Sequence, residues 1–500
     1  MTRKQFLSTS AAMASSAQAP AQVRSSGSAP KNVLFLLSDQ HRPSSLGCAG
    51  DSVAKTPHLD SLARGGVRFT NAYCENPVCT PSRASLLTGL HTHHHQTWSN
   101  GTPWPFEHKT IAHHMGRAGY VTALIGKMHF VDAQTHGFDY RLDFNDWYQY
   151  LGPKTSLYAE EIDRANSGSG LPQINDLWKD FGDPWIGSRV RDNREGLVHI
   201  GRASQIAEQD HFESFVTRES VRFLERFGKK HPFFLISSFL KPHDPYMPAE
   251  RFAKMFPVAD MQLPDTYGKV DLANIPAEIR ERIRAHTPTP ELSDVRNGKM
   301  RIAMYYASLA QVDDCMGQIL AKLRELDLEK NTVVLYSTDH GEMLGEHGLW
   351  QKFVFYDPSA GVPLIFRVPG LTPQDTRCAT PVSLVQIVST LLEICGVSAP
   401  AGLDGTSFAG NLREPANTKD APVFAEFALH SKQARYMMRR GDFKYSHYVS
   451  DTPELYNLRD DPQEMKNLAL DPAFKGKLQE MKSQLFAWHT PREISPGVYV

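Results

Sequence analysis

The chain has 500 residues, of which 41% are apolar and 22% charged, and its formal net charge is −1. This length and apolar content are sufficient for a large buried core, which we expect to form one large domain and a smaller one. The balanced charge argues against a surface built to bind nucleic acid. The six cysteines are sparse and lack paired spacing, so neither a zinc site nor a disulfide scaffold is indicated.

The first 30 residues contain Arg3, Lys4 and an apolar pair, followed by a Ser- and Ala-rich run. This pattern is similar to a degenerate twin-arginine export signal, with Arg-Lys in place of Arg-Arg. We therefore expect a periplasmic or secreted protein. A cytoplasmic protein with a disordered N-terminal tail is the alternative. No later segment approaches the ~18 apolar residues of a membrane span.

Several apolar runs are typical of strands in a buried sheet, at residues 32–38, 67–73, 120–126, 232–239, 331–338 and 362–370. Helical patterns lie between and after them, at residues 56–63, 111–118, 211–227, 299–326 and 385–395. We expect an α/β fold with a mixed, mostly parallel central sheet flanked by helices. Short strands at residues 422–427, 435–440 and 443–448 predict a smaller antiparallel subdomain, before a final helix.

Polar residues directly follow two of these strands. Asp39 and Gln40 follow residues 32–38, and Asp339 and His340 follow residues 331–338. Open α/β sheets place ligands at the carboxyl ends of their strands. Two carboxylates, an amide oxygen and an imidazole suit Ca²⁺, or less tightly Mg²⁺, and the imidazole also admits Mn²⁺.

Two further strands lead to basic residues. Lys127 and His129 alternate after residues 120–126, which places both polar tips on one face. The alternative for this pair is a surface lysine beside a packed histidine. His243 follows residues 232–239, and its neighbours Lys241 and Asp244 are either residues at the rim of the site or solvated charges.

Residues 76–89 bring a thiol, hydroxyl groups and a guanidinium close together. Pro81 is typical of a first helical position, so Cys79 should lie at or just before a helix N-terminus. The unpaired N–H groups and the helix dipole favour an anion there, and Arg83 can point its fork at the same anion. A buried structural cysteine in a turn is the alternative.

The run from Cys79 to Arg83, followed by Leu87-Thr88-Gly89, resembles the signature of the type I sulfatases. The resemblance implies an alkaline phosphatase-like fold. It also implies that a formylglycine-generating enzyme oxidises Cys79 to Cα-formylglycine, an aldehyde whose hydrate attacks sulfur. The resemblance extends over residues 31–490, apart from residues 132–213, which we interpret as an insertion that shapes the choice of substrate.

The family resemblance further implies roles for single residues. Arg83, Lys127 and Lys352 would hold the ester oxygens together with the metal. His243, with Lys352, would protonate the departing alcohol, and His129 would take a proton from the remaining hydroxyl. A histidine cluster at residues 91–95 fits no metal motif, and we expect His93 or His95 at the rim of the substrate site.

The metal ligands implied by the resemblance are Asp39, Gln40, Cys79, Asp339 and His340. Gln40 and His340 depart from the Asp and Asn that sulfatases often carry. Asp-His resembles iduronate sulfatase-like members, and Asp-Gln with Asp-His resembles the phosphonate monoester hydrolases. With Gln40 and His340 a metal site is still expected, but these two residues do not specify which metal it binds or which ester is the substrate.

We therefore expect an export signal or tail at residues 1–30, a catalytic domain at 31–415 and a C-terminal subdomain at 416–500. The leading hypothesis is an enzyme that hydrolyses sulfate monoesters of a small molecule or glycan, with a sulfated carbohydrate preferred. The alternatives are a choline-sulfatase or arylsulfatase, a phosphonate or phosphate ester hydrolase, and a non-catalytic binder of sulfated glycans. The oligomeric state cannot be read from the sequence.

Overall fold

The computed structural model describes residues 31–105, 107–130, 134–158, 201–286, 295–429 and 431–490. The expected export segment at residues 1–30 lies outside the described residues. The same holds for most of the expected insertion, since residues 132–133 and 159–200 are not described.

A nine-stranded sheet forms the centre of the fold, in the order β4-β3-β5-β1-β6-β7-β2-β8, with β9 paired to β2. Only β7 runs against the other strands of this sheet. The mostly parallel sheet expected from the sequence is thereby confirmed. The strands are β1 (Asn32–Ser38), β2 (Val67–Tyr73), β3 (Val121–Gly126), β4 (Tyr140–Leu142), β5 (Phe233–Ser238), β6 (Thr332–Thr338), β7 (Gly361–Arg367), β8 (Thr376–Cys378) and β9 (Val382–Ser383).

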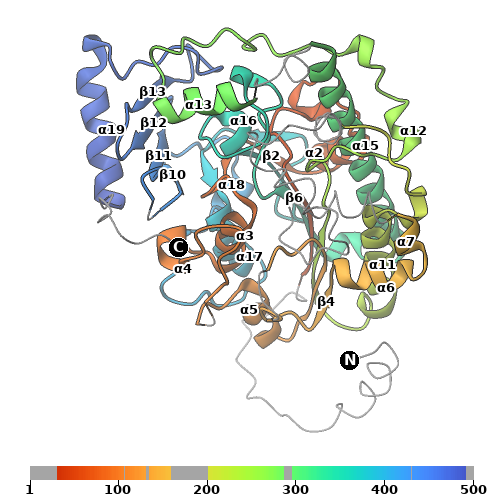
Figure 1. Ribbon diagram of the computed structural model, residues 1–500. Helices are drawn as coiled ribbons and strands as arrows, with labels where there is room; N and C mark the ends of the chain where they lie inside the picture. The colour runs from red at the N-terminus through yellow and green to blue at the C-terminus, as the bar shows by residue number, and fades with distance from the viewer. Residues whose placement is uncertain are drawn as a thin grey trace. The chain divides into compact units, whose positions relative to one another are not determined.

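Helices cover both faces of the sheet (Figure 1). One face carries α2 (Pro57–Arg64), α11 (Phe212–Phe227) and α15 (Val295–Glu325), and the other carries α3 (Cys79–Thr88), α5 (Ile111–Arg117) and α17 (Ile387–Ile394). Side chains of β1 alternate between the two resulting cores, because successive residues of a strand point to opposite faces. Phe35 and Leu37 belong to the core under α3, and Leu34 and Leu36 to the core under α15.

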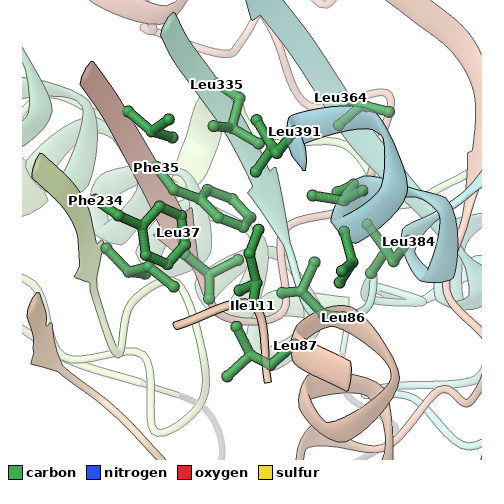
Figure 2. Close-up of a cluster of buried hydrophobic side chains, with 14 of the residues drawn as sticks. Phe35, Leu37, Leu86, Leu87, Ile111, Phe234, Leu335, Leu364, Leu384 and Leu391 are labelled. Atoms are coloured by element: carbon green, nitrogen blue, oxygen red, sulfur yellow. The ribbon is translucent and has the colours of Figure 1, made fainter. Parts of the chain in front are cut away.

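The core beneath α3 is shown in Figure 2, where Phe35 and Leu37 of β1 lie among leucines from the helices and neighbouring strands. Leu86 and Leu87 come from α3, and Leu391 comes from α17. Every residue of α3 is buried, including its polar ones. Packing on all sides therefore holds this helix rigidly against the sheet.

A second sheet of four antiparallel strands follows near the C-terminus, in the order β10-β11-β12-β13. Helix α19 packs on it through Met481 and Leu485 (Figure 1). The remaining elements of the fold are α4 (Thr92–His95), α6 (Phe144–Leu151), α7 (Lys154–Leu157), α12 (Glu250–Ala253), α13 (Ala277–His286), α16 (Asp357–Ala360), α18 (Ala409–Arg413), β10 (Val423–Phe427), β11 (Arg435–Arg440), β12 (Phe443–Tyr448), β13 (Glu454–Asn457) and α19 (Lys475–Trp488).

One helix start differs from the expectation. We expected Pro81 at the first helical position, whereas α3 begins at Cys79 and has Val78 as its extended N-cap. The first N–H groups of a helix have no partner within it, so a proline in the third position also costs no hydrogen bond. Cys79 thus lies at the N-terminus of the helix, as predicted.

Candidate active site

Parallel strands bring their carboxyl ends to the same edge of the sheet, and the predicted site residues meet at this edge. β1 ends before Asp39 and Gln40, β3 before Lys127, and β6 before Asp339. β5 leads to His243 and β2 to the turn before Cys79. All of the predicted catalytic and metal-binding residues are buried, none being more than 3% exposed.

The thiol of Cys79 is surrounded by nitrogen donors. Its Sγ lies 3.2 Å from Lys352 Nζ, 3.2 Å from His340 Nε2 and 3.8 Å from Lys127 Nζ. Burial alone would raise the pKa of this thiol, but Lys127, Lys352 and His340 hold it well below its usual range. A cysteine in this setting is surrounded by groups that favour its charged form, which argues against a purely structural thiol in a turn.

Arg83 bonds the carboxylates of the site. Its Nη2 donates to Asp39 Oδ2 at 2.9 Å, and its Nε donates to Asp339 Oδ2 at 2.8 Å. Its Nη1 donates to the Lys127 carbonyl at 2.9 Å and to Ser238 Oγ at 3.0 Å. The sequence led us to expect this guanidinium at the bound anion, whereas its fork lies on the two aspartates of the protein.

Asp39, Cys79, Asp339 and His340 form a compact group whose candidate ligand atoms all lie within 4.8 Å of one another. Lys127 Nζ adds a 2.6 Å ion pair with Asp39 Oδ2. Burial opposes ionisation of Asp39, yet Lys127, His243 and Arg83 keep its pKa far below the usual range, while burial and the Asp39 charge raise the pKa of Asp339. Two oxygens, an imidazole and a sulfur thus converge on one point, which is a donor set able to hold a divalent cation.

Gln40 and Lys352 connect this group to His243. Lys352 Nζ lies 2.9 Å from Gln40 Oε1 and 2.8 Å from His243 Nε2, in addition to its contact with Cys79. The Nδ1 atom of His243 faces the Asp244 carbonyl. An N–H on Nδ1 leaves Nε2 as the acceptor for the Lys352 ammonium, so His243 and Lys352 can share one proton.

His129 is buried beside the same centre. Burial lowers its pKa to about 4, even though the neighbouring Cys79 thiol favours its charged form. Neither ring nitrogen meets hydrogen-bond geometry with another group of the described chain. Its backbone φ of 55° is unusual for a residue other than glycine, and its carbonyl accepts a hydrogen bond from Thr80 Oγ1. A neutral imidazole is thereby held next to the first turn of α3.

Some residues lie elsewhere than we expected. His93 bonds Glu426 of the C-terminal sheet, and His95 Nε2 lies 3.0 Å from Ser85 Oγ on the buried side of α3. These contacts connect α4 to β10 and α3, and a place at the substrate rim for His93 or His95 stays a prediction. Lys241 is buried and forms a 3.4 Å ion pair with Glu213, so it is not a solvated charge.

Three contributors were missed by reasoning from the sequence. Asn100 Oδ1 accepts the Thr80 N–H at 3.1 Å, and Ser82 Oγ donates to the Asp339 carbonyl. Glu342 accepts a hydrogen bond from Gln40 Nε2. Ser82 stands inside the predicted motif, whereas the contact of Glu342 with Gln40 joins residues 302 positions apart, which the local sequence does not specify.

Comparisons with known proteins identify the families and proteins to which this chain is similar. The profile of the Sulfatase family matches residues 31–397, and that of the C-terminal part of N-sulphoglucosamine sulphohydrolase matches residues 345–490. A choline-sulfatase of Rhizobium meliloti (strain 1021) is 29% identical over 88% of this chain and 83% of its own length. An arylsulfatase of Clostridium perfringens (strain 13 / Type A) is 29% identical over 91% of this chain and 93% of its own.

Among solved structures, a phosphonate monoester hydrolase of Agrobacterium radiobacter has a TM-score of 0.75 and 24% identity, covering 91% of this chain and 95% of that one. This likeness supports the alkaline phosphatase-like fold. Within the described part of the chain, no helix combines the length and the apolar character that crossing a membrane requires.

Proposed function

This chain belongs to the sulfatase family of sulfuric ester hydrolases, and we propose that it cleaves a sulfate monoester of a carbohydrate with a formylglycine nucleophile at position 79 and a divalent metal. The observation that carries the proposal is the placement of Cys79 at the N-terminus of α3, within 3.2 Å of Lys352 and His340. A side chain there also lies 3.8 Å from Lys127 Nζ and at a helix N-terminus, where anions are favoured.

Oxidation of Cys79 to the aldehyde by the formylglycine-generating enzyme, followed by addition of one water, would supply a gem-diol, with one hydroxyl for attack on sulfur and a second whose deprotonation allows sulfate to leave. Lys352 contacts both the position-79 side chain and His243, so this pair is placed to deliver a proton to the departing alcohol oxygen. His129 is neutral because burial lowers its pKa to about 4, and it can accept the proton of the second hydroxyl. The overall reaction consumes one water and releases one alcohol and one sulfate.

The metal would be held by Asp39, Asp339, His340, Gln40 and the position-79 side chain. The fit is supported by the arrangement of the carboxylates, because Arg83 and Lys127 occupy Asp39 Oδ2 while Asp39 Oδ1 points to the Cys79 sulfur at 4.0 Å. Mostly oxygen ligands favour Ca²⁺, and the imidazole also admits Mg²⁺ or Mn²⁺. When bound, the cation would withdraw charge from the sulfate oxygens and favour ionisation of the attacking hydroxyl.

A carbohydrate is proposed as the alcohol because the C-terminal match is to a family described as N-sulphoglucosamine sulphohydrolase. The names of the similar choline-sulfatase and arylsulfatase keep a choline or aryl ester as alternatives. A panel of sulfate esters separates these cases. The carbohydrate proposal predicts the highest kcat/KM on a sulfated sugar, and a higher value on choline sulfate or an aryl sulfate would contradict it.

A phosphonate monoester hydrolase is the second candidate, and it is favoured by one observation. Gln40 and His340 both lie at the Cys79 centre, which matches the ligand pattern resembling those hydrolases. Lys127 and His129 favour a sulfatase. The same panel should therefore include phosphonate and phosphate monoesters, and a phosphonate that is turned over faster than every sulfate ester would replace the proposal.

The modification itself is tested by mass spectrometry of the tryptic peptide from Phe69 to Arg83, taken from the native host. Conversion of one cysteine makes this peptide about 18 Da lighter, and Cys74 in the same peptide is an internal control. Loss of mass assigned to Cys79 by fragmentation is the expected result. An unmodified Cys79 in fully active enzyme would refute the formylglycine nucleophile.

A non-catalytic glycan binder is tested by Cys79→Ala. The proposed enzyme should lose turnover, whereas a binder would have no turnover in the wild type and would keep its affinity for the glycan. The proposal also includes a formylglycine-generating enzyme as partner and export directed by residues 1–30. Fractionation of the host with and without residues 1–30 tests the export, and wild-type protein that stays in the cytoplasm would contradict it.

A further inference from the structure

The amide of Gln40 lies between two carboxylates and an ammonium. Its Nε2 is 3.0 Å from Asp244 Oδ1 and 2.5 Å from Glu342 Oε2, and its Oε1 is 2.9 Å from Lys352 Nζ. Each amide hydrogen thus meets one carboxylate, and the oxygen meets a cation. Rotation of the amide by half a turn would put its oxygen against both carboxylates and its NH₂ against the ammonium, so only one orientation satisfies every partner.

The backbone of Gln40 is fixed as well. Its N–H donates to Asp339 Oδ1 at 3.2 Å, and its carbonyl accepts from Tyr305 Oη at 3.2 Å. Its φ of 65° lies in the left-handed region, which a residue other than glycine keeps only where its surroundings hold it. The Cα position of Gln40 is therefore fixed by its backbone contacts. The orientation of its side-chain amide depends on the groups around that amide.

The two carboxylates differ in how firmly they are held. Glu342 Oε1 accepts the backbone N–H groups of Leu344 at 2.8 Å and Gln351 at 2.6 Å, so only Oε2 can face Gln40. The other oxygen of Asp244 instead accepts the side-chain amide of Gln351 at 2.8 Å. That amide belongs to a half-buried side chain and can turn to present its oxygen.

We propose that Glu342, assisted by Asp244, is a positioning residue that orients the Gln40 amide oxygen toward Lys352 and the metal ligands, and so raises the affinity of the site for a divalent cation. The inference rests on the metal of the proposed function and adds a residue outside the ligand set. Partners that orient a metal ligand in this way commonly account for about 10- to 100-fold in metal affinity or activity.

The test compares Glu342→Gln with Asp244→Asn, which both replace a carboxylate by an amide of equal size. In Glu342→Gln the oxygen stays on the two backbone N–H groups, so the new NH₂ faces the NH₂ of Gln40 and forces the Gln40 amide to turn. In Asp244→Asn the oxygen can stay on Gln40, because the Gln351 amide turns to accept from the new NH₂. The two variants change the net charge equally but should differ in their effect.

The readout is the dissociation constant for Ca²⁺ and Mn²⁺, measured by calorimetry on metal-stripped protein. We expect Glu342→Gln to weaken binding by about 10- to 100-fold and Asp244→Asn by less than about threefold. Circular dichroism and the urea midpoint check the fold. Where Glu342→Gln folds poorly, the double variant Gln40→Glu with Glu342→Gln is compared with Gln40→Glu alone. Two carboxylates face each other in Gln40→Glu, whereas the double variant restores a donor–acceptor pair and should bind at least about tenfold more tightly despite its lower negative charge; equal or weaker binding by the double variant would contradict the inference.

Equal losses in Glu342→Gln and Asp244→Asn would assign the effect to net charge and overturn the inference, as would a Glu342→Gln protein that binds metal like the wild type. In both outcomes the wild type still binds metal and hydrolyses sulfate esters, so the proposed function stands. A wild-type protein that hydrolyses sulfate esters but binds no divalent cation would overturn this inference together with the proposed metal.

Discussion

Glu75 provides a test of the electrostatics of the turn that precedes Cys79, because it is a carboxyl group with no solvent exposure. It follows β2 in the chain, and its Oε1 accepts the Val385 N–H at 2.8 Å. Burial raises its pKa from 4.5 to about 7, although the hydrogen bond from Val385 lowers it, and the nearby Glu426 raises it further. The folded protein thus binds a proton at Glu75 more tightly than the unfolded chain does.

The sign of the effect follows from proton linkage. Between pH 4.5 and about 7 the unfolded chain releases the Glu75 proton while the folded protein keeps it, so this group lowers the free energy of unfolding as the pH rises. The rise in pKa from 4.5 to about 7 corresponds to about 3 kcal/mol, at ~1.4 kcal/mol for each pH unit. The Glu75→Gln variant cannot ionise and should lack this loss.

The measurement is equilibrium urea unfolding of wild type and Glu75→Gln at pH 4.5 and pH 8. We expect the free energy of unfolding of the variant, relative to that of the wild type, to increase by about 3 kcal/mol between these two pH values. Any constant cost of fitting the amide cancels in this comparison. Glu414→Gln, at an exposed position, is the matched control. A difference between Glu75→Gln and wild type that is the same at both pH values would refute the reasoning.

Three further outcomes are expected. Arg435→Met removes a buried guanidinium that holds the Phe353 carbonyl next to Lys352, and should lower kcat about tenfold or more because Lys352 is misplaced. The control is Arg440→Met, on the same strand but paired with exposed Asp420, which should change kcat less than twofold. Equal losses of kcat in the two variants would contradict a role of Arg435 in placing Lys352. Arg83→Lys keeps the charge but cannot bond both aspartates, so metal affinity measured by calorimetry should fall at least tenfold, and unchanged affinity would contradict it. Chelation of the metal should abolish activity and lower the thermal midpoint of unfolding, since a ligand at 100 times its Kd stabilises the folded protein by about 2.7 kcal/mol. A midpoint that responds neither to chelator nor to added Ca²⁺ would argue against the metal.

Much of the fold could be predicted because its signals are local. The buried strands form continuous apolar runs, and β1, β2 and β6 start and end within one residue of the expected bounds. The helix start at Cys79 was displaced by two residues, because proline is compatible with several positions in a first turn. β13 was not predicted as a strand, since its four residues carry too little periodicity.

The gathering of the candidate site residues at one sheet edge could be predicted, but not all of their contacts. Strand ends and the Cys79 motif indicate which side chains gather at the sheet edge. The bonds from Arg83 to both aspartates and from Gln40 to Glu342 join residues up to 302 positions apart, and nothing in the local sequence specifies them. The C-terminal sheet likewise holds the backbone beside Lys352 through Arg435, a contact between strand β11 and a loop that only the folded chain defines.

These contacts distinguish Arg83 from the two lysines of the site by the groups that each side chain contacts. The N–H groups of Arg83 are directed to protein oxygens, so it keeps the two aspartates together despite their like charges. Lys127 also pairs with Asp39 and Lys352 with Gln40, but both ammonium groups reach the sulfur of Cys79 as well. A negatively charged ester held at position 79 would therefore meet the two lysines before it meets the arginine. We accordingly expect substitution of either lysine to weaken transition-state binding directly, whereas substitution of Arg83 would act through the carboxylates that would hold the proposed metal.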